Sequence, residues 1–398
     1  MEFYHDILEN LLDKLIDYRG KTPKKTLSGI PLVTAKIVKN GTINGYTEYI
    51  AEEDYEKWMV RGFPKVGDVI LTTEAPLGEV ALLKEEKVAL AQRIVCLRGK
   101  DNVLDNTYLK YYLQSGKGQK SLSARESGTT VTGIKQAELR RVDIEYPTYD
   151  DQRRIASILS SLDRKIELNN KINADLEEMA QAIFMNWFVD FEPFKDGKFV
   201  DSELGMIPEG WKVGTLGDIT KNKSAKVKER NDVKVLSPVT TGELVLSEEY
   251  FTKQVFSSSI AKYKIVNKGD FAYNPARVNI GSLGRNEFDF DGCVSPVYVV
   301  FSVLDGYENY FDLFRKTDFF KDSVASLAIG GVRQSLSYDD LSSIEVIIPS
   351  ENAVEEFNNL YNQMKKTIKA NKLENSRLST LRDTLLPRLM SGELEVPE

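Results

Sequence analysis

Two long runs of regularly spaced apolar positions dominate the pattern of the chain, one in each half. In the first run, positions from Ile155 to Ile183 follow one another at spacings of four and three residues, and a second run from Phe357 to Leu385 has the same spacings. Because residues three and four apart lie on one face of a helix, each run predicts an amphipathic helix of about 40 residues, roughly 60 Å long. The positions of the first run are Ile155, Leu159, Leu162, Ile166, Asn169, Asn173, Leu176, Ala180 and Ile183.

This spacing is that of a coiled-coil seam, and we expect the two helices to pair in antiparallel directions. Four asparagines interrupt the seam, Asn169 and Asn173 in the first helix and Asn371 and Asn375 in the second. A polar residue in an apolar seam lowers stability but fixes register and orientation, so we predict that these asparagines set the register of the helix pair. The pattern also fits two amphipathic helices in globular cores, with the asparagines solvated on a helix flank.

The two halves of the chain repeat one another at an offset of 202 residues. Gly67-Asp68 recurs as Gly269-Asp270, in each case before a strand-like run. Pro147 recurs as Pro349, in each case just before a long helix. A fixed offset of this kind is the signature of an internal repeat, and it predicts a pseudo-two-fold organisation.

Outside the long helices, the chain mixes strand patterns with short helices. Strand-like runs include VILTT at 69–73 and VALAQRIVCLRG at 88–99, and helices are expected at about 106–115, 307–316 and 318–326. We therefore predict an α+β fold, in which two mixed α/β domains are separated by two long antiparallel coiled-coil helices. The expected boundaries are a first mixed domain at 1–148, the first helix at 149–190, a Pro- and Gly-marked linker at 191–211, a second mixed domain at 212–349, and the second helix with a tail at 350–398.

The composition argues against several classes of protein. Hydrophobic residues make up 41% of the 398 residues, which is enough to bury proper cores. No apolar run reaches the roughly 18 residues of a membrane span, and we expect a cytoplasmic protein. The single histidine, His5, argues against histidine-based triads and multi-histidine metal sites. The two cysteines, Cys96 and Cys293, cannot form a disulfide framework.

Charge and motifs together favour a binding protein over an enzyme. The net charge of −7 does not exclude nucleic acid as a partner, because residues 149–204 alone carry 12 acidic and 7 basic groups. The sequence has no glycine-rich phosphate loop, dinucleotide fingerprint or nucleophile elbow. Asn274-Pro275-Ala276-Arg277 comes nearest to a nucleobase aminomethyltransferase motif, but Ala276 and Arg277 replace its second proline and its aromatic residue. We therefore expect no catalysis, cofactor or metal in this chain.

Polar and basic loops at matching places in the two halves are the candidate nucleic-acid contacts. Arg, Asn, Gln and Thr side chains recognise base edges, and Lys mostly contacts phosphates. Each loop taken alone also fits an ordinary solvated surface. The candidates in the first half are Arg19, Lys21, Lys24, Lys25, Thr73, Gln92, Arg93, Thr129 and Thr130. Those in the second half are Lys221, Lys223, Lys226, Asn274, Arg277, Asn279, Arg333 and Gln334.

Five segments give the chain a resemblance to the specificity subunit of Type I restriction–modification enzymes. WFVDFEPFKDG (187–197) with IPEGWKVGTLGDI (207–219) resembles the central junction of that family, and KGDFAYNPARVNIGSLG (268–284) resembles its target-recognition domain. PTYDDQRRIASILSSLDRKIELNNKINADLE (147–177) resembles its conserved helical region, and LRDTLLPRLMSGEL (381–394) its C-terminal helix ending. The first half matches less well, because ILTTEAPLG stands where FAYNPARVNIGSLG stands in the second.

The resemblance implies a non-catalytic DNA-binding scaffold. The two mixed domains would be target-recognition domains for an asymmetric, bipartite sequence, and the helices would set the spacer. Two modification subunits, which bind S-adenosylmethionine, would dock on the chain, and a restriction subunit that uses ATP and Mg could join. The alternatives left by the residues themselves are a coiled-coil adaptor that does not contact DNA and a stand-alone enzyme that modifies nucleic acid.

Overall fold

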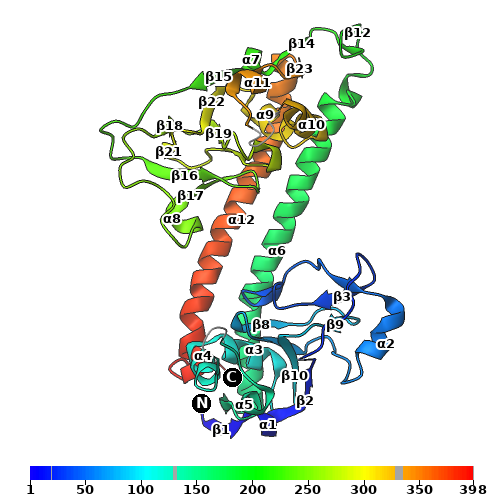
Figure 1. Cartoon of the computed structure of the whole chain (residues 1–398), viewed down its shortest axis with the longest axis vertical. Helices are drawn as coiled ribbons and strands as arrows, with labels where there is room; N and C mark the ends of the chain where they lie inside the picture. The colour runs from blue at the N-terminus through cyan, green and yellow to red at the C-terminus, as the bar shows by residue number, and fades with distance from the viewer. Residues whose placement is uncertain (19, 129–131, 328–334, 398) are drawn as a thin grey trace. The chain divides into compact units, whose positions relative to one another are not determined.

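A computed structural model describes residues 1–18, 20–128, 132–327 and 335–397 of the chain. These residues form two compact units (Figure 1). Unit 1 consists of Met1–Lys171 and Asn371–Glu398, and unit 2 is the continuous segment Ile172–Ala370. The C-terminal segment of the chain therefore belongs to the unit that contains the N-terminus.

The two predicted long helices are confirmed. Helix α6 spans Tyr149–Phe188, 40 residues, and α12 spans Glu351–Ser391, 41 residues. Each begins directly after a proline and a hydroxyl residue that can cap it. The Thr148 hydroxyl accepts a hydrogen bond from the Asp151 backbone N–H at 3.3 Å, and α12 begins after Ser350 in the same way. The unit boundary falls inside both helices, so each unit contains a segment of each.

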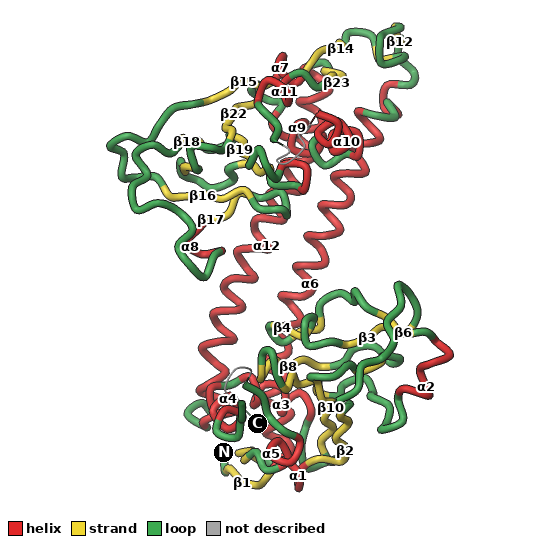
Figure 2. The backbone as a smooth tube through the Cα atoms, viewed as in Figure 1, coloured by secondary structure: helices red, strands yellow, loops and turns green. Residues whose placement is uncertain are grey.

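Within unit 1 the segments of α6 and α12 run antiparallel, as predicted. Asp163 contacts Arg382 and Asn169 contacts Asn375, so residue numbers rise along one helix as they fall along the other. Figure 2 shows both helices as continuous tubes. The seam is thus formed by the first half of α6 with the last part of α12.

The described part of unit 1 contains a four-stranded antiparallel sheet of order β2-β10-β7-β8 and a three-stranded sheet of order β6-β3-β9. Strands β3 and β9 are parallel, and β1–β11 and β4–β5 form separate antiparallel pairs. The strands are β1 (Phe3–Ile7), β2 (Leu12–Asp17), β3 (Ile30–Val33), β4 (Val38–Lys39), β5 (Thr42–Ile43), β6 (Tyr49–Ile50), β7 (Val69–Thr73), β8 (Leu77–Leu82), β9 (Ala89–Leu90), β10 (Ile94–Gly99) and β11 (Asp143–Pro147). The short helices are α1 (Leu8–Leu11), η1 (Glu52–Asp54), α2 (Tyr55–Trp58), α3 (Asn106–Gln114), α4 (Gly116–Ser123) and α5 (Gln136–Arg140).

The central sheet of unit 1 is buried on both faces. Val69 and Leu71 of β7 lie in a core shared with α3, whereas Ile70 lies in a second core with residues of β3 and β9. Successive strand residues point to opposite faces, so a strand covered on both sides is apolar throughout. This arrangement explains why VILTT shows no alternation of apolar and polar residues.

The C-terminal segment completes the first of these cores. Leu389, Met390 and Val396 are buried there together with Ile155 of α6. The ammonium group of Met1 donates to the Glu395 carboxylate at 2.9 Å. The two ends of the chain therefore meet within unit 1, where Figure 1 marks N and C.

Unit 2 has the same sheet plan. Its four-stranded antiparallel sheet has the order β15-β22-β19-β20, and its second sheet has the order β17-β16-β21-β18, in which β16 and β21 are parallel. Two antiparallel pairs, β14–β23 and β12–β13, stand apart from these sheets. The strands are β12 (Phe199–Val200), β13 (Ile207–Pro208), β14 (Lys212–Thr215), β15 (Thr220–Lys223), β16 (Lys234–Pro238), β17 (Leu244–Leu246), β18 (Lys264–Val266), β19 (Phe271–Tyr273), β20 (Leu283–Arg285), β21 (Gly292–Val294), β22 (Val299–Val303) and β23 (Glu345–Ile348). The short helices are η2 (Glu192–Phe194), α7 (Leu216–Ile219), α8 (Ser247–Tyr250), η3 (Val278–Ile280), α9 (Glu308–Phe314), α10 (Asp318–Leu327) and α11 (Tyr338–Ser342).

The internal repeat predicted from the sequence is visible in the elements themselves. The starting residues of α3 and α9, of α5 and α11, and of α6 and α12 each differ by the predicted 202 residues. The corresponding sheets have the same strand order, except that β18 adds a fourth strand to the second sheet of unit 2. The predicted mixed α/β fold with two long helices is therefore confirmed.

One predicted strand is divided. The run at 88–99 forms β9 and β10, with Gln92-Arg93 between them. Arg93 has a φ of 72°, a left-handed conformation that a strand cannot contain, so the chain leaves one sheet and enters the other there. The apolar pattern gave no sign of this break, because the strands on both sides of it are buried.

Candidate nucleic-acid interface

In unit 1, three of the candidate loops meet where β7 ends and β10 begins. The Thr73 backbone N–H donates to the Arg93 carbonyl at 2.8 Å, and the Thr73 carbonyl accepts from the Ile134 N–H at 2.9 Å. Gly133, next to Ile134, bridges both Glu74 and Ser127. The loop ends around Thr73, Arg93 and Ser127 are thus joined by backbone hydrogen bonds. Thr129 and Thr130 lie outside the described residues.

Close packing of the backbone holds this junction. A Cβ atom on Gly133 would lie 2.9 Å from the Thr73 carbonyl oxygen, which is shorter than ordinary contacts allow. Thr73 itself is buried, and its hydroxyl has no hydrogen-bond partner among the described residues. Arg93 is half exposed and pairs with Glu74 at 2.8 Å. The exposed guanidinium of Arg93 is therefore the group at this junction best placed to contact a ligand.

The remaining candidates of the first half lie away from this junction. Lys21 and Lys24 are exposed, and Gln92 is partly buried beside Arg93. Lys25 pairs with Glu48 at 2.7 Å. Arg19 lies outside the described residues.

In unit 2, the equivalent place is the turn between β19 and β20. Asn274 follows β19 directly, Arg277 precedes η3, and Asn279 lies within it; the last two are exposed. The Pro275 carbonyl accepts from the Leu336 N–H at 3.1 Å, and the Tyr273 hydroxyl donates to the Leu336 carbonyl at 3.3 Å. The β19 turn is therefore joined to the segment after residue 334. Arg333 and Gln334 lie outside the described residues.

The lysines of the second half fall into two groups. Lys221 and Lys226 are exposed. Lys223 donates to both carboxylate oxygens of Asp270, at 2.7 and 2.9 Å, and Asp270 is buried. Because a buried carboxylate requires a partner, the Lys223 ammonium has a structural role in unit 2.

The predicted register residue Asn169 is buried at the helix seam of unit 1. Its amide donates to the Asn375 side-chain oxygen at 2.9 Å and to Glu374 at 2.7 Å, and the Asn375 amide donates to Asn170 at 2.8 Å. Asn173 is also buried, whereas Asn371 is partly exposed. The structure thus brings Asn169 and Asn375 together, as expected of residues that fix a register.

A second polar cluster at this seam was not predicted. Asp163 of α6 accepts hydrogen bonds from Lys110 at 2.8 Å and Tyr111 at 2.6 Å, both on α3, and from Arg382 of α12 at 2.9 Å. Burial acts to raise the pKa of Asp163, but these cations and hydrogen bonds outweigh it and hold the pKa below its usual value. Burial is the main reason that the pKa of Lys110 lies below its usual value, although Asp163 raises it. The cluster ties α3, α6 and α12 into one unit.

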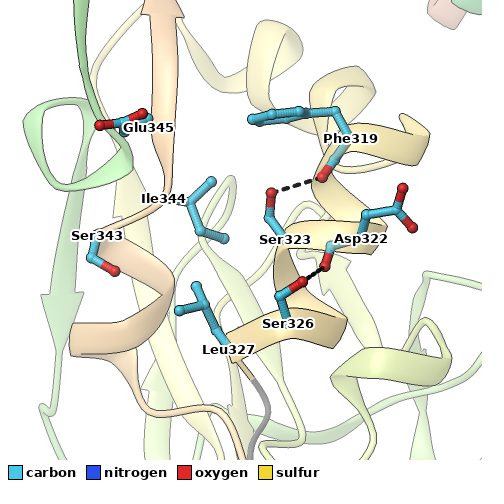
Figure 3. A pocket seen from close by; sticks show the side chains of 8 residues that line it. All are labelled: Phe319, Asp322, Ser323, Ser326, Leu327, Ser343, Ile344 and Glu345. Carbon is cyan, nitrogen blue, oxygen red and sulfur yellow. Dashed lines mark hydrogen bonds between the residues drawn. The ribbon is translucent and has the colours of Figure 1, made fainter.

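A hollow of about 410 Å³ opens on unit 2 between α10 and the end of α11 (Figure 3). Phe319, Ser323 and Leu327 of α10 face Ile344 and Glu345 across it. In unit 1 the position equivalent to Leu327 is Arg125, which pairs with Asp143 at 3.3 Å. The two units therefore differ in the side chains at this surface, and none of the candidate DNA-contacting residues lines the hollow.

Two further features of the described residues bear on chemistry. Among residues 1–18, 20–128, 132–327 and 335–397, no group of three or more His, Cys, Asp or Glu side chains is arranged to hold a metal ion. No helix in the same ranges is both long and apolar enough to cross a membrane.

Comparisons with known proteins agree with the resemblance noted in the sequence. A model of the Type I restriction modification DNA specificity domain matches residues 16–178. The Type I restriction enzyme MjaIX specificity subunit of Methanocaldococcus jannaschii is 29% identical over 399 residues, which cover 95% of this chain and 91% of that protein. The HindI specificity subunit of Haemophilus influenzae is 26% identical over 357 residues, covering 69% and 74%.

The fold is shared with a solved structure of the same class. The S subunit of a Type I restriction–modification system from M. genitalium matches with a TM-score of 0.59 and 17% identity, over 100% of this chain and 97% of that chain. The domain match and the relatives all indicate a specificity subunit of a Type I restriction–modification enzyme, and the solved S subunit shows the same fold.

Proposed function

We propose that this chain recognises an asymmetric, bipartite DNA target with two recognition regions, residues 1–148 and 212–349. The observation that carries the proposal is the pair of junctions at the ends of the equivalent strands β7 and β19, where the hydrogen bond from Ile134 to Thr73 recurs as that from Leu336 to Pro275 but different side chains lie around it. Arg93 and Glu74 stand at the first junction, and Asn274, Arg277 and Asn279 at the second. Different hydrogen-bonding groups on the same framework select different bases, so each region has its own half-site.

The proposed DNA contacts are of two kinds, those to base edges and those to phosphates. Arg93, Gln92, Arg277, Asn274 and Asn279 are proposed to contact base edges. Thr73 is buried and supports the first junction from beneath. The remaining residues proposed to contact DNA, mostly its phosphates, are Arg19, Lys21, Lys24, Lys25, Thr129, Thr130, Lys221, Lys226, Arg333 and Gln334. Of these, Arg19, Thr129, Thr130, Arg333 and Gln334 lie outside the described residues. Lys223 contributes through its pair with Asp270.

The long helices, residues 149–190 and 350–398, are proposed to set the spacer between the half-sites. Asn169, Asn173, Asn371 and Asn375 fix their register, and residues 191–211 connect the two repeats. The chain itself transfers no methyl group and cuts no DNA. Two modification subunits supply S-adenosylmethionine-dependent methylation, and a restriction subunit supplies ATP- and Mg-dependent cleavage when it is present.

The base contacts are tested by selecting bound sequences from a random DNA library with the chain in complex with its modification subunits. We expect two conserved blocks separated by a spacer of fixed length. Arg277→Ala should relax one block and Arg93→Ala the other, each weakening binding to the preferred base by about tenfold or more. Lys321→Ala, an exposed charge on α10, is the matched control and should change neither block. A single undivided block, or relaxation of both blocks by one variant, would contradict the proposal.

The spacer is tested by lengthening both helices at the unit boundary. One heptad is inserted between Lys171 and Ile172 and another between Ala370 and Asn371, which leaves the contacts inside each unit intact. Each insertion adds about 10 Å at 1.5 Å per residue. Since DNA rises about 3.4 Å per base pair, we expect the selected spacer to lengthen by roughly three base pairs, or bipartite binding to be lost because the half-sites rotate.

A heptad inserted in the exposed turn between Glu203 and Leu204 is the control for this experiment and should leave the spacer unchanged. An unchanged spacer at unchanged affinity in the helix-lengthened protein would show that the helices do not measure the distance.

A further inference from the structure

The polar contacts described between α6 and α12 in unit 1 join one repeat of the chain to the other. Asp163 of α6 pairs with Arg382 of α12 at 2.9 Å, and Lys165 of α6 pairs with Glu374 of α12 at 3.3 Å. The amide of Asn169 also donates to Glu374, at 2.7 Å. Because α6 belongs to the first repeat and α12 to the second, each of these pairs needs one residue from each repeat.

The repeat offset shows what a pair of two first-repeat helices would lack. The residues 202 positions before Arg382 and Glu374 are Ala180 and Ile172. In a seam of two α6 helices with the same register, Asp163 would therefore face alanine and Lys165 would face isoleucine. Neither ion pair would form, and Asp163, whose side chain is only 26% exposed, would keep only its partners on α3.

A pair of two second-repeat helices would be opposed by charge. The residue 202 positions after Asp163 is Lys365, so the same register would place Arg382 opposite Lys365. Like charges across a helix interface destabilise it, and the two-fold symmetry of such a pair would repeat the contact. In unit 2, Lys365 instead pairs with Glu287 at 2.5 Å, outside the long helices.

We propose that these side chains form a pairing code that selects the helix of the other repeat and rejects a second copy of the same helix. The code consists of Asp163, Lys165, Glu374 and Arg382, with Asn169 as its buried centre. These particular ion pairs form only in the mixed pair, and the repulsion between Arg382 and Lys365 arises only in the pair of second-repeat helices. Specificity of this kind arises from differences between competing pairs, not from the strength of one pair. The inference concerns assembly of the chain and does not depend on which DNA is recognised.

The test uses the intact chain, cleaved after folding. A protease site is inserted between Glu203 and Leu204, both exposed in the turn after β12, and the folded protein is cut there. Cleaved protein labelled with heavy isotopes is mixed with unlabelled cleaved protein, and urea is raised until the fragments exchange and is then removed. Native mass spectrometry counts mixed and self-paired fragments. We expect mixed pairs to exceed self pairs by about tenfold or more, well above random pairing.

Variants separate the code from all other contacts between the fragments. Arg382→Glu places two carboxylates together in the mixed pair, whereas in the second-fragment self pair the new carboxylate forms an ion pair with Lys365. The ratio of second-fragment self pairs to mixed pairs should therefore rise at least about tenfold. Adding Asp163→Lys and Lys110→Met to Arg382→Glu reverses both charges without leaving two lysines together, because Lys110 pairs with Asp163 in the wild type, and it should restore the preference for mixed pairs.

Arg377→Glu is the matched control, because Arg377 is an exposed residue of the same helix and the charge change is the same. It should leave the proportions of the pairs unchanged. Random pairing of the wild-type fragments would overturn the proposal. So would an Arg382→Glu variant that, although folded before cleavage, pairs as the Arg377→Glu control does, or a charge-reversed variant with Lys110→Met that is folded before cleavage but fails to recover mixed pairs.

Discussion

Removing the Asp163 carboxylate should destabilise unit 1 strongly. The carboxylate accepts hydrogen bonds from Lys110, Tyr111 and Arg382, and Lys110 is only 5% exposed. In Asp163→Ala the Lys110 ammonium stays buried without its anion. Breaking a buried pair from one side costs about 3–5 kcal/mol, and the partial exposure of Asp163 and Arg382 places the expected loss near the lower end, about 3 kcal/mol.

The assay is thermal unfolding of unit 1, a body of about 200 residues. At roughly 2–4 °C per kcal/mol for a body of this size, we expect its transition to fall by about 6–12 °C. Hydrogen exchange of α3 amides assigns the loss to unit 1, since the two units need not unfold together. Glu167→Ala, which removes an exposed carboxylate of α6 within unit 1, should change the transition by less than about 1 kcal/mol, because its partner Lys84 is exposed as well.

A double variant tests whether the unpaired charge of Lys110 causes this loss of stability. In Asp163→Asn with Lys110→Met, no buried cation is left without an anion, and the asparagine can still accept from Tyr111. Most of the stability should return, because replacing both partners of a buried pair is close to neutral. A loss below about 1 kcal/mol in Asp163→Ala, or a double variant no more stable than it, would show that packing and not the buried charge dominates the site.

Three further outcomes follow from single sites. Asn169→Ala should lower the free energy of unfolding in urea by about 1–2 kcal/mol, because the hydrogen bonds from the buried amide to Glu374 and Asn375 are lost. An unchanged urea midpoint would contradict a role of Asn169 in holding the two helices together. Gly133→Ala should loosen the first junction, since its Cβ would lie 2.9 Å from the Thr73 carbonyl oxygen, and we expect faster hydrogen exchange at residues 73 and 134 with α3 unaffected. Burial would raise the pKa of Asp312, but its neighbouring cations hold it lower, at about 2, against 3.8 in the unfolded chain. Its contribution, on the order of 2 kcal/mol, is therefore complete above about pH 4 and is lost as the pH falls toward 2, and Asp312→Asn should remove that part of the acid sensitivity of unit 2.

The sequence was sufficient for the parts of the fold that depend on periodicity. The four-three spacing predicted both long helices, and the offset of 202 residues predicted that α3, α5 and α6 recur as α9, α11 and α12. Pairing between strands distant in sequence carries no such period. The parallel partnership of β3 with β9, and the break at Arg93 that separates β9 from β10, depend on tertiary packing that single-sequence patterns do not contain.

The positions of the candidate loops were predicted from the same repeat, and their contacts with DNA stay a prediction. The repeat placed polar loops at matching positions, and the structure joins Thr73 to Arg93 and Pro275 to Leu336. The sequence did not distinguish Lys223, which pairs with the buried Asp270, from the exposed Lys221 of the same strand. Lys110 was missed because a lysine on a short helix normally faces solvent, and its partner Asp163 lies 53 residues away.

The first and last residues of the chain meet in unit 1, and this has a consequence for how the protein is made. Unit 2 is one uninterrupted segment, Ile172–Ala370, so all of it is translated before the second segment of unit 1. Unit 1 still lacks Leu389, Met390 and Val396 of its core at that stage, and the partner of its N-terminal ammonium as well. Unit 1, whose first segment precedes unit 2 in the chain, is thus completed only after the whole of unit 2 has been translated. A stop codon in place of Leu389 should therefore unfold unit 1 and leave unit 2 intact.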